Sequence, residues 1–208
     1  MDPAPPRPIE TNPASPPREP GFLGSRAFDL LMGLGVLLIS VASLVIAVNA
    51  NRTQDRMLAA SVWPSLMFGT SNVSDDGKPQ IALDLLNRGV GPARTRWAEV
   101  AYDGAPLRNL DDLRARCCTD PVSIESYSSG VQRRVLGADE WIQLVRVTRE
   151  GVPEPLWREL EASLSKIRFR ACYCSVLDDC WLLDSDTDEP EPMDRCPTAP
   201  AVLWGVRD

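Results

Sequence analysis

The sequence predicts a mainly β protein of the α+β class, with an N-terminal transmembrane helix followed by a β-sandwich-like antiparallel domain containing two short helices. Three observations lead to this prediction. An uncharged apolar run lies near the N-terminus, apolar and polar residues alternate in several later segments, and turn residues separate those segments. The chain has 208 residues, which leaves about one domain after the helix.

Residues 1–26 are predicted to form a disordered, Pro-rich tail. Eight of the first 20 residues are proline, so this segment cannot bury enough apolar surface to offset the entropy cost of ordering it. PxxP spacings occur from Pro3 to Pro6 and from Pro5 to Pro8, and they would suit an aromatic-lined groove. A solvated tail is nevertheless the favoured interpretation.

The run Leu30–Val48 has 19 residues, none of them charged. At about 1.5 Å per residue it would span roughly 28 Å, close to the thickness of the hydrocarbon core of a bilayer. A core helix of a soluble protein would need a polar face, which this run lacks. We therefore expect a transmembrane helix over 27–49, with lipid around residues 30–48. A helical stalk over 50–63 is expected to end at Pro64.

The helix is expected to remain as an uncleaved anchor, because it is longer than the apolar region of a signal peptide and follows about 25 mostly polar residues. Basic residues do not fix its orientation, since Arg18 and Arg26 precede it while Arg52 and Arg56 follow it. All cysteines follow the helix, as expected for a domain in an oxidising compartment. The predicted location is the inner (cytoplasmic) membrane, with the C-terminal domain facing outside.

Residues 64–208 are predicted to form the β-rich domain. Its period-two segments are typical of antiparallel sheets with one exposed face, and they are 65–70, 80–86, 94–102, 141–147 and 167–175. Strict alternation in the fourth segment would place Trp141, Gln143, Val145 and Val147 on one face. Asp-Gly pairs at 76–77 and 103–104 are expected to form hairpin turns, which require positive φ.

Two short helices are predicted between these strands. Leucines three residues apart between 107 and 113 indicate the first, with Asn109 as its N-cap. Leucines four residues apart between 156 and 164 indicate the second, with Pro155 in its first turn.

The segment Asn87–Ala93 (NRGVGPA) is rich in glycine and follows a predicted strand. A phosphate-binding loop is not supported, because the third glycine is missing, no Gly-Lys-Ser/Thr follows, and Pro92 lacks an amide donor. We instead expect a tight connection with Gly89 and Gly91 at positive φ.

This segment, the sequence ASVWP at residues 60–64 and the hairpin containing Cys172-Tyr-Cys-Ser and Cys180-Trp181 resemble a group of uncharacterised bacterial single-pass membrane proteins. The resemblance extends over roughly residues 50–185. It implies an anchor with an extracytoplasmic β domain, and it implies no catalytic residue.

The candidate site residues are six cysteines, expected to form disulfides: Cys117, Cys118, Cys172, Cys174, Cys180 and Cys196. A Cys174–Cys180 bridge would cross a hairpin, and Cys172 could reach Cys117 or Cys118. A bond between the adjacent Cys117 and Cys118 is disfavoured because it strains the backbone. The sequence does not select among the 15 connectivities. Free thiols, a thiolate metal site and a redox site are less favoured alternatives, the last two because no CxxC motif is present.

Residues 178–194 contain eight acidic residues and no basic one, and we expect a solvated acidic loop. Asp184, Asp186 and Asp188 are spaced like the start of a calcium-binding loop. Glu189, however, occupies the glycine position, and Arg195 stands where a bidentate glutamate belongs.

Composition excludes several functions. The net charge of −7 argues against a nucleic-acid partner, and the absence of histidine excludes Ser-His-Asp and Cys-His catalysis. We therefore expect no enzyme, no cofactor and no catalytic or metal-binding residue. The predicted function is a membrane-anchored interaction or structural module for an envelope protein partner. A ligand- or metal-binding sensor that uses the cysteine and acidic segments is the alternative, and a carboxylate hydrolase ranks third.

Overall fold

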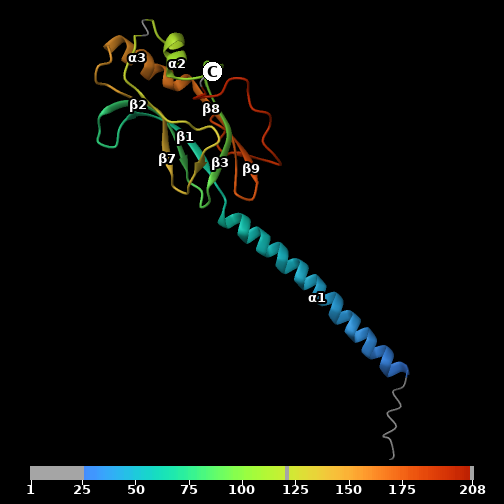
Figure 1. The fold of residues 1–208 in the computed structure, drawn as a ribbon. Helices are drawn as coiled ribbons and strands as arrows, with labels where there is room; N and C mark the ends of the chain where they lie inside the picture. Colours follow the sequence, from blue (N-terminus) through green and yellow to red (C-terminus); the bar gives the residue numbers. More distant parts are fainter. Residues whose placement is uncertain (1–25, 120–121, 207–208) are drawn as a thin grey trace, which may run out of the picture. The chain divides into compact units, whose positions relative to one another are not determined.

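The computed structural model of the chain describes residues 26–119 and 122–206 (Figure 1). The chain divides into two compact units between Arg52 and Thr53. The first contains most of helix α1, and the second contains its end and the β domain. The predicted tail lies outside the described residues, except for Arg26, which begins α1.

Helix α1 (Arg26–Ser61) is continuous over 36 residues. From Phe28 to Ser61 it is long and apolar enough to cross a membrane. No part of its most apolar stretch is buried against other described residues. The segments predicted as transmembrane helix and stalk therefore belong to one helix. It ends three residues before Pro64.

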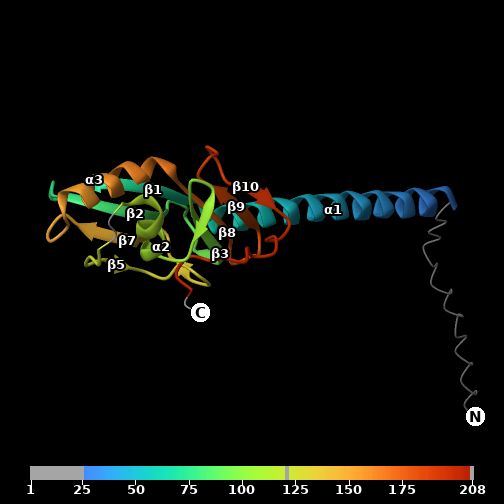
Figure 2. The same cartoon turned by 90° about the horizontal axis from the view of Figure 1, so that it is seen from above.

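Within the described residues, ten strands form two sheets in which every pairing is antiparallel. The four-stranded sheet has the order β1 (Leu66–Val73), β2 (Pro79–Asn87), β7 (Trp141–Thr148), β5 (Tyr127–Ser128). The six-stranded sheet has the order β10 (Glu191–Met193), β9 (Cys180–Asp184), β8 (Ile167–Cys174), β3 (Ala93–Tyr102), β4 (Ala105–Leu107), and β6 (Val135–Leu136) also pairs with β3. Figure 2 shows β1, β2 and β7 on one side of the domain and β3, β8 and β9 on the other.

The two sheets share one hydrophobic core. The predicted inward residues Ile81, Leu83 and Leu85 of β2 are all buried. Phe68 of β1 stacks on Phe169 of β8 with ring centroids 4.6 Å apart, which joins the two sheets directly. The predicted mainly β, antiparallel α+β fold is thus present.

Both predicted helices are present, and they pack at one end of the domain (Figure 1). Helix α2 (Leu110–Cys117) is capped by Asn109, whose side chain accepts a hydrogen bond from the Asp112 amide at 3.0 Å. Helix α3 (Glu154–Ser163) has proline in its first turn and continues into the 3-10 helix η1 (Leu164–Lys166). The two predicted Asp-Gly turns contain Gly77 and Gly104 at φ values of 77° and 78°.

A β-bulge corrects the predicted faces of β7. Leu83 pairs with Val145 and Asp84 pairs with Gln143, so Leu144 has no opposite residue. The bulge reverses the alternation, because one extra residue shifts every later side chain to the other face. Val145 is consequently buried, whereas Trp141 is 50% exposed.

The acidic segment is also more ordered than predicted. Strands β9 and β10 occupy part of the expected loop, because β9 begins with an apolar stretch that pairs with β8 and buries Leu183. Its acidic residues remain mostly exposed.

Candidate functional site

A groove of about 390 Å³ lies in the second unit, beside strand β1 and under the β9–β10 connection. We call it the aromatic groove. Residues preceding and within β1 form one wall, strands β8 and β9 form the floor, and residues 185–190 form the rim. The lining residues that matter most are Trp63, Phe68, Tyr173, Trp181, Asp184, Asp188 and Glu189.

The aromatic rings of the groove are held by neighbouring groups. Tyr173 and Trp181 are directly opposite in the β8–β9 register, and their ring centroids are 5.8 Å apart. The Tyr173 hydroxyl accepts a hydrogen bond of 3.4 Å from the Leu66 amide, which links the floor to β1. Trp63 is 50% exposed, so its ring remains available to a ligand.

The rim carries negative charge that basic neighbours compensate only in part. Arg168 pairs with Asp186, and Arg170 Nε lies 3.3 Å from Asp184 Oδ2. Asp188 and Glu189 have no salt bridge within the described part of the chain. Both residues line the same groove as the half-exposed Trp63. Carboxylates and an exposed aromatic ring in one groove attract cations through Coulomb and cation–π interactions.

Strand β1 leaves an edge along the groove. It is the terminal strand of its sheet and pairs with β2 alone among the described strands. Met67 on this strand is 55% exposed. An edge strand presents unpaired backbone groups to which an extended peptide can add.

The groove wall that contains Trp63 is held in place by the side chain of Asn87, which is fully buried. Its Oδ1 accepts hydrogen bonds from the amides of Ser65 at 3.1 Å and Gly89 at 3.0 Å. Its Nδ2 lies within hydrogen-bond distance of three carbonyl oxygens, those of Gly91 (2.8 Å), Gly137 (2.9 Å) and Leu136 (3.2 Å). We call Asn87, Gly89 and Gly91, together with the segment 62–65 that they hold, the Asn87 clamp.

The glycines of the clamp do not have the predicted positive φ. They are required instead because the backbone of the 62–65 segment passes directly over them. A Cβ atom on Gly91 would lie 2.1 Å from the Val62 carbonyl oxygen, and one on Gly89 would lie 2.4 Å from the Ser65 amide nitrogen. The glycine-rich segment therefore holds protein backbone.

Burial raises the pKa of Tyr173 to about 12, and the hydrogen bond from the Leu66 amide acts in the opposite direction. An unfolded tyrosine has a pKa of about 10. The folded state therefore keeps a proton that the unfolded state loses as the pH rises from 10 to 12. Stability that Tyr173 provides below pH 10 is lost across this interval, by roughly 2–3 kcal/mol at its upper end.

We expect this loss to be smaller in Tyr173→Phe, which cannot ionise. Urea unfolding of both proteins at pH 9 and pH 11.5, followed by tryptophan fluorescence, measures the difference. If the free energy of unfolding depended on pH equally in the two proteins, the raised pKa of Tyr173 would be contradicted.

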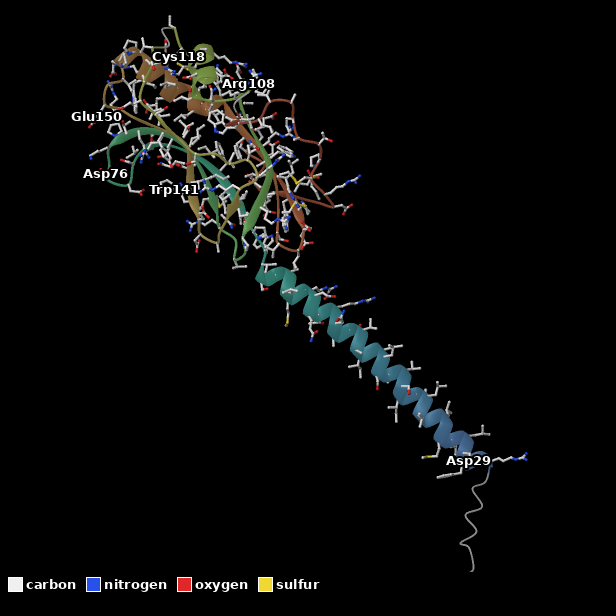
Figure 3. The ribbon with its side chains drawn as sticks, viewed as in Figure 1. Asp29, Asp76, Arg108, Cys118, Trp141 and Glu150 are labelled. Carbon is white, nitrogen blue, oxygen red and sulfur yellow. A yellow bond between two sulfur atoms is a disulfide. The ribbon has the colours of Figure 1, made fainter. Side chains whose placement is uncertain are left out.

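The structure places all six cysteines in disulfides: Cys117–Cys118, Cys172–Cys196 and Cys174–Cys180. Figure 3 labels Cys118 and draws the sulfur atoms in yellow. The hairpin bridge suggested by the sequence is present. The expectation that Cys117 and Cys118 do not bond each other is wrong, as is the proposed reach of Cys172 to either of them.

Cys172 is bridged to Cys196 because the C-terminal segment covers the outer face of β8 and β3. Trp97, opposite Cys172 in the β3–β8 register, donates a hydrogen bond from Nε1 to the Pro197 carbonyl at 3.0 Å. Trp204 follows and is 2% exposed. Trp204 belongs to the hydrophobic core, and this tryptophan near the end of the sequence was the available signal that the C-terminal segment docks on the domain.

The sulfur atoms of Cys174, Cys180 and Cys196 all lie within 4.8 Å of one another. Metal binding requires thiolates, whereas these sulfurs are in disulfides. The arrangement in its oxidised form thus gives no support to the metal-sensor alternative.

Compared with protein-family models, curated proteins and solved structures, the chain matches none of them. The resemblance to single-pass bacterial membrane proteins stays a prediction.

Proposed function

We propose that this protein is a membrane-anchored interaction module whose aromatic groove binds an extended, cationic segment of an envelope protein. The observation that carries the proposal is the combination of exposed aromatic surface at Trp63 with the uncompensated carboxylates of Asp188 and Glu189. Cation–π contacts of this kind contribute about 0.5–2 kcal/mol each. The protein's net charge of −7 favours encounter with a basic partner.

The proposed location is the bacterial inner membrane, with α1 as a single-pass anchor and the β domain in the periplasm. Length and apolar composition support the anchor. The three disulfides all follow the apolar run, which supports an oxidising compartment for the domain. Anchoring would keep the groove close to partners in the same envelope and raise their effective concentration.

An extended partner fits the site better than a helical one. The groove follows the unpaired edge of β1, where main-chain hydrogen bonds can supply affinity and the aromatic pocket can select a side chain. We propose binding without catalysis, so the groove residues act through contact and charge.

The proposal is tested with the full chain in lipid nanodiscs and the probe peptide acetyl-Val-Lys-Val-Lys-Val-Lys-amide, using calorimetry. We expect binding, and we expect Asp188→Asn combined with Glu189→Gln to weaken it roughly 3- to 10-fold, the range for two partly exposed charge pairs. Trp63→Ala should weaken it by a similar factor through loss of the ring.

The matched control is Asp75→Asn combined with Glu150→Gln, which removes the same charge from exposed positions outside the groove. This variant should bind the peptide like the unmodified protein. The same peptide with Glu in place of Lys should not bind. Equal weakening in both double variants, or no binding of the basic peptide, would refute the groove as the cation site.

A further inference from the structure

We infer that the two disulfides on the outer face of β8 form a thiol–disulfide exchange site, in which a Cys174–Cys196 bridge can replace either existing bridge. The proposal concerns Cys172, Cys174, Cys180 and Cys196, which we call the sulfur cluster. It does not depend on the aromatic groove.

The geometry of the strands brings the four residues together. Cys172 and Cys174 are two residues apart on β8, and therefore face the same side of the sheet. Cys180 is directly opposite Cys174 in the β8–β9 register. Cys196 reaches the same side from the C-terminal segment, through its bond to Cys172.

The two bridges are in contact with each other. Cys174 Sγ lies 3.7 Å from Cys196 Sγ, although these two atoms belong to different disulfides. This separation is close to the distance at which reacting atoms are held before attack. Cys172 and Cys174 are 0% and 1% exposed, so a thiolate formed on Cys174 meets the neighbouring protein disulfide more readily than a dissolved thiol. Cys180 is 7% exposed and is the more accessible end of its bridge for a reductant.

The exchange is balanced in two steps. A dithiol reductant of the compartment first opens Cys174–Cys180, becoming a disulfide itself while each of the two cysteines gains a hydrogen. The Cys174 thiol then loses its proton to solvent, and its thiolate attacks Cys196 Sγ. The Cys174–Cys196 bond forms, the Cys172–Cys196 bond breaks, and Cys172 Sγ leaves with the electron pair and takes up a proton.

The exchange moves one of the two thiols within the cluster. After exchange, the free thiols belong to Cys172 and Cys180 instead of Cys174 and Cys180. The hairpin between β8 and β9 is then no longer cross-linked, while the C-terminal segment stays attached to β8. The Cys117–Cys118 pair lies at the end of α2 and takes no part.

Two single substitutions in the full chain test the proposal from opposite sides. Cys180→Ser leaves Cys174 as a thiol next to the Cys172–Cys196 bridge. Cys172→Ser leaves Cys196 as a thiol next to the Cys174–Cys180 bridge. We expect both variants to contain the same Cys174–Cys196 bridge in at least about a tenth of the molecules at equilibrium, because exchange between similar thiols is close to balanced.

The bridges are identified after incubation at pH 8, acid quenching and alkylation with N-ethylmaleimide. Chymotrypsin cleaves after Tyr173 and separates Cys172 from Cys174, and cleavage before Asp178 by endoproteinase Asp-N separates Cys174 from Cys180. Mass spectrometry then assigns each bridge. The rate of approach to equilibrium after a shift from pH 5 should rise about tenfold per pH unit below the thiol pKa, since the thiolate is the attacking species.

The proposal is overturned if Cys180→Ser retains only Cys172–Cys196 and Cys172→Ser retains only Cys174–Cys180. Unmodified protein treated with one equivalent of dithiothreitol provides the same measurement if a variant fails to fold. In the partly reduced protein, alkylated Cys172 together with a Cys174–Cys196 bridge supports exchange. Alkylation confined to the two cysteines of one original bridge refutes it.

Discussion

Replacing Asn87 by aspartate is expected to lower the free energy of unfolding of the β domain by more than about 3 kcal/mol at pH 7. The amide nitrogen of Asn87 faces three carbonyl oxygens at 2.8–3.2 Å in a fully buried position. A carboxylate there would lose these donors and place its charge against acceptors. An unpaired buried polar group costs about 1–3 kcal/mol, and a charged one costs more.

This substitution has a characteristic pH dependence. The buried aspartate would have a pKa raised above its unfolded value of about 3.9, because burial and the carbonyls disfavour the charged form. Its destabilisation should therefore be constant above the raised pKa and diminish as the pH falls from that value towards 3.9. Urea titrations of the full-length protein in detergent micelles between pH 4 and 8 measure this change.

Asn87→Ala is the matched control, because alanine removes the same hydrogen bonds without adding a charge. The Asn87→Ala variant should be destabilised by about 3 kcal/mol, and its free energy of unfolding should change with pH as that of the unmodified protein does. If the free energy of unfolding of Asn87→Asp changed with pH in the same way as that of the unmodified protein, the proposed burial of the carboxylate would be contradicted.

Gly91→Ala is expected to destabilise the domain by about 3 kcal/mol, because its Cβ would approach the Val62 carbonyl oxygen to 2.1 Å and the Val62 Cα to 2.5 Å. These are backbone atoms, so no side-chain rotation relieves the overlap, and overpacking of this kind costs about 1–3 kcal/mol or more. The same urea titrations measure the loss.

Two further variants separate close packing from backbone conformation. Asn tolerates positive φ, so Gly91→Asn would be mild if φ were the reason for the glycine. We expect it to be as destabilising as Gly91→Ala. Gly69→Ala in β1 is the matched control, since its Cβ would meet nothing within 4 Å, and it should change stability by less than about 0.5 kcal/mol. Equal effects of Gly69→Ala and Gly91→Ala would contradict the packing argument.

An uninterrupted apolar run and period-two alternation were sufficient to predict the long elements of this fold. The apolar run before Asn49 corresponds to α1, and the five alternating segments correspond to β1, β2, β3, β7 and β8. The N-cap at Asn109 was predictable because its hydrogen bond is local. The strands β4, β5, β6 and β10 have two or three residues each, too few for alternation to be visible.

Features that depend on contacts between distant segments were not predictable in the same way. The bulge at Leu144 is fixed by pairing with β2, and the glycines of the clamp are explained by the passage of residues 62–65 over them. The aromatic groove combines Trp63 with Trp181, which are far apart in the sequence. The cysteines were identified as candidates, but the partner of Cys172 depended on where the C-terminal segment docks.

The Asn87 clamp determines how mechanical force would enter the domain. A pull transmitted along α1 reaches the domain at residues 63–65, where the Trp63 carbonyl, the Ser65 carbonyl and the Ser65 amide are each hydrogen-bonded to residues 87–91. These bonds must break before β1 can be peeled from its sheet. Force applied to the chain from α1 would therefore act on the clamp before it acts on the pairing of β1 with β2.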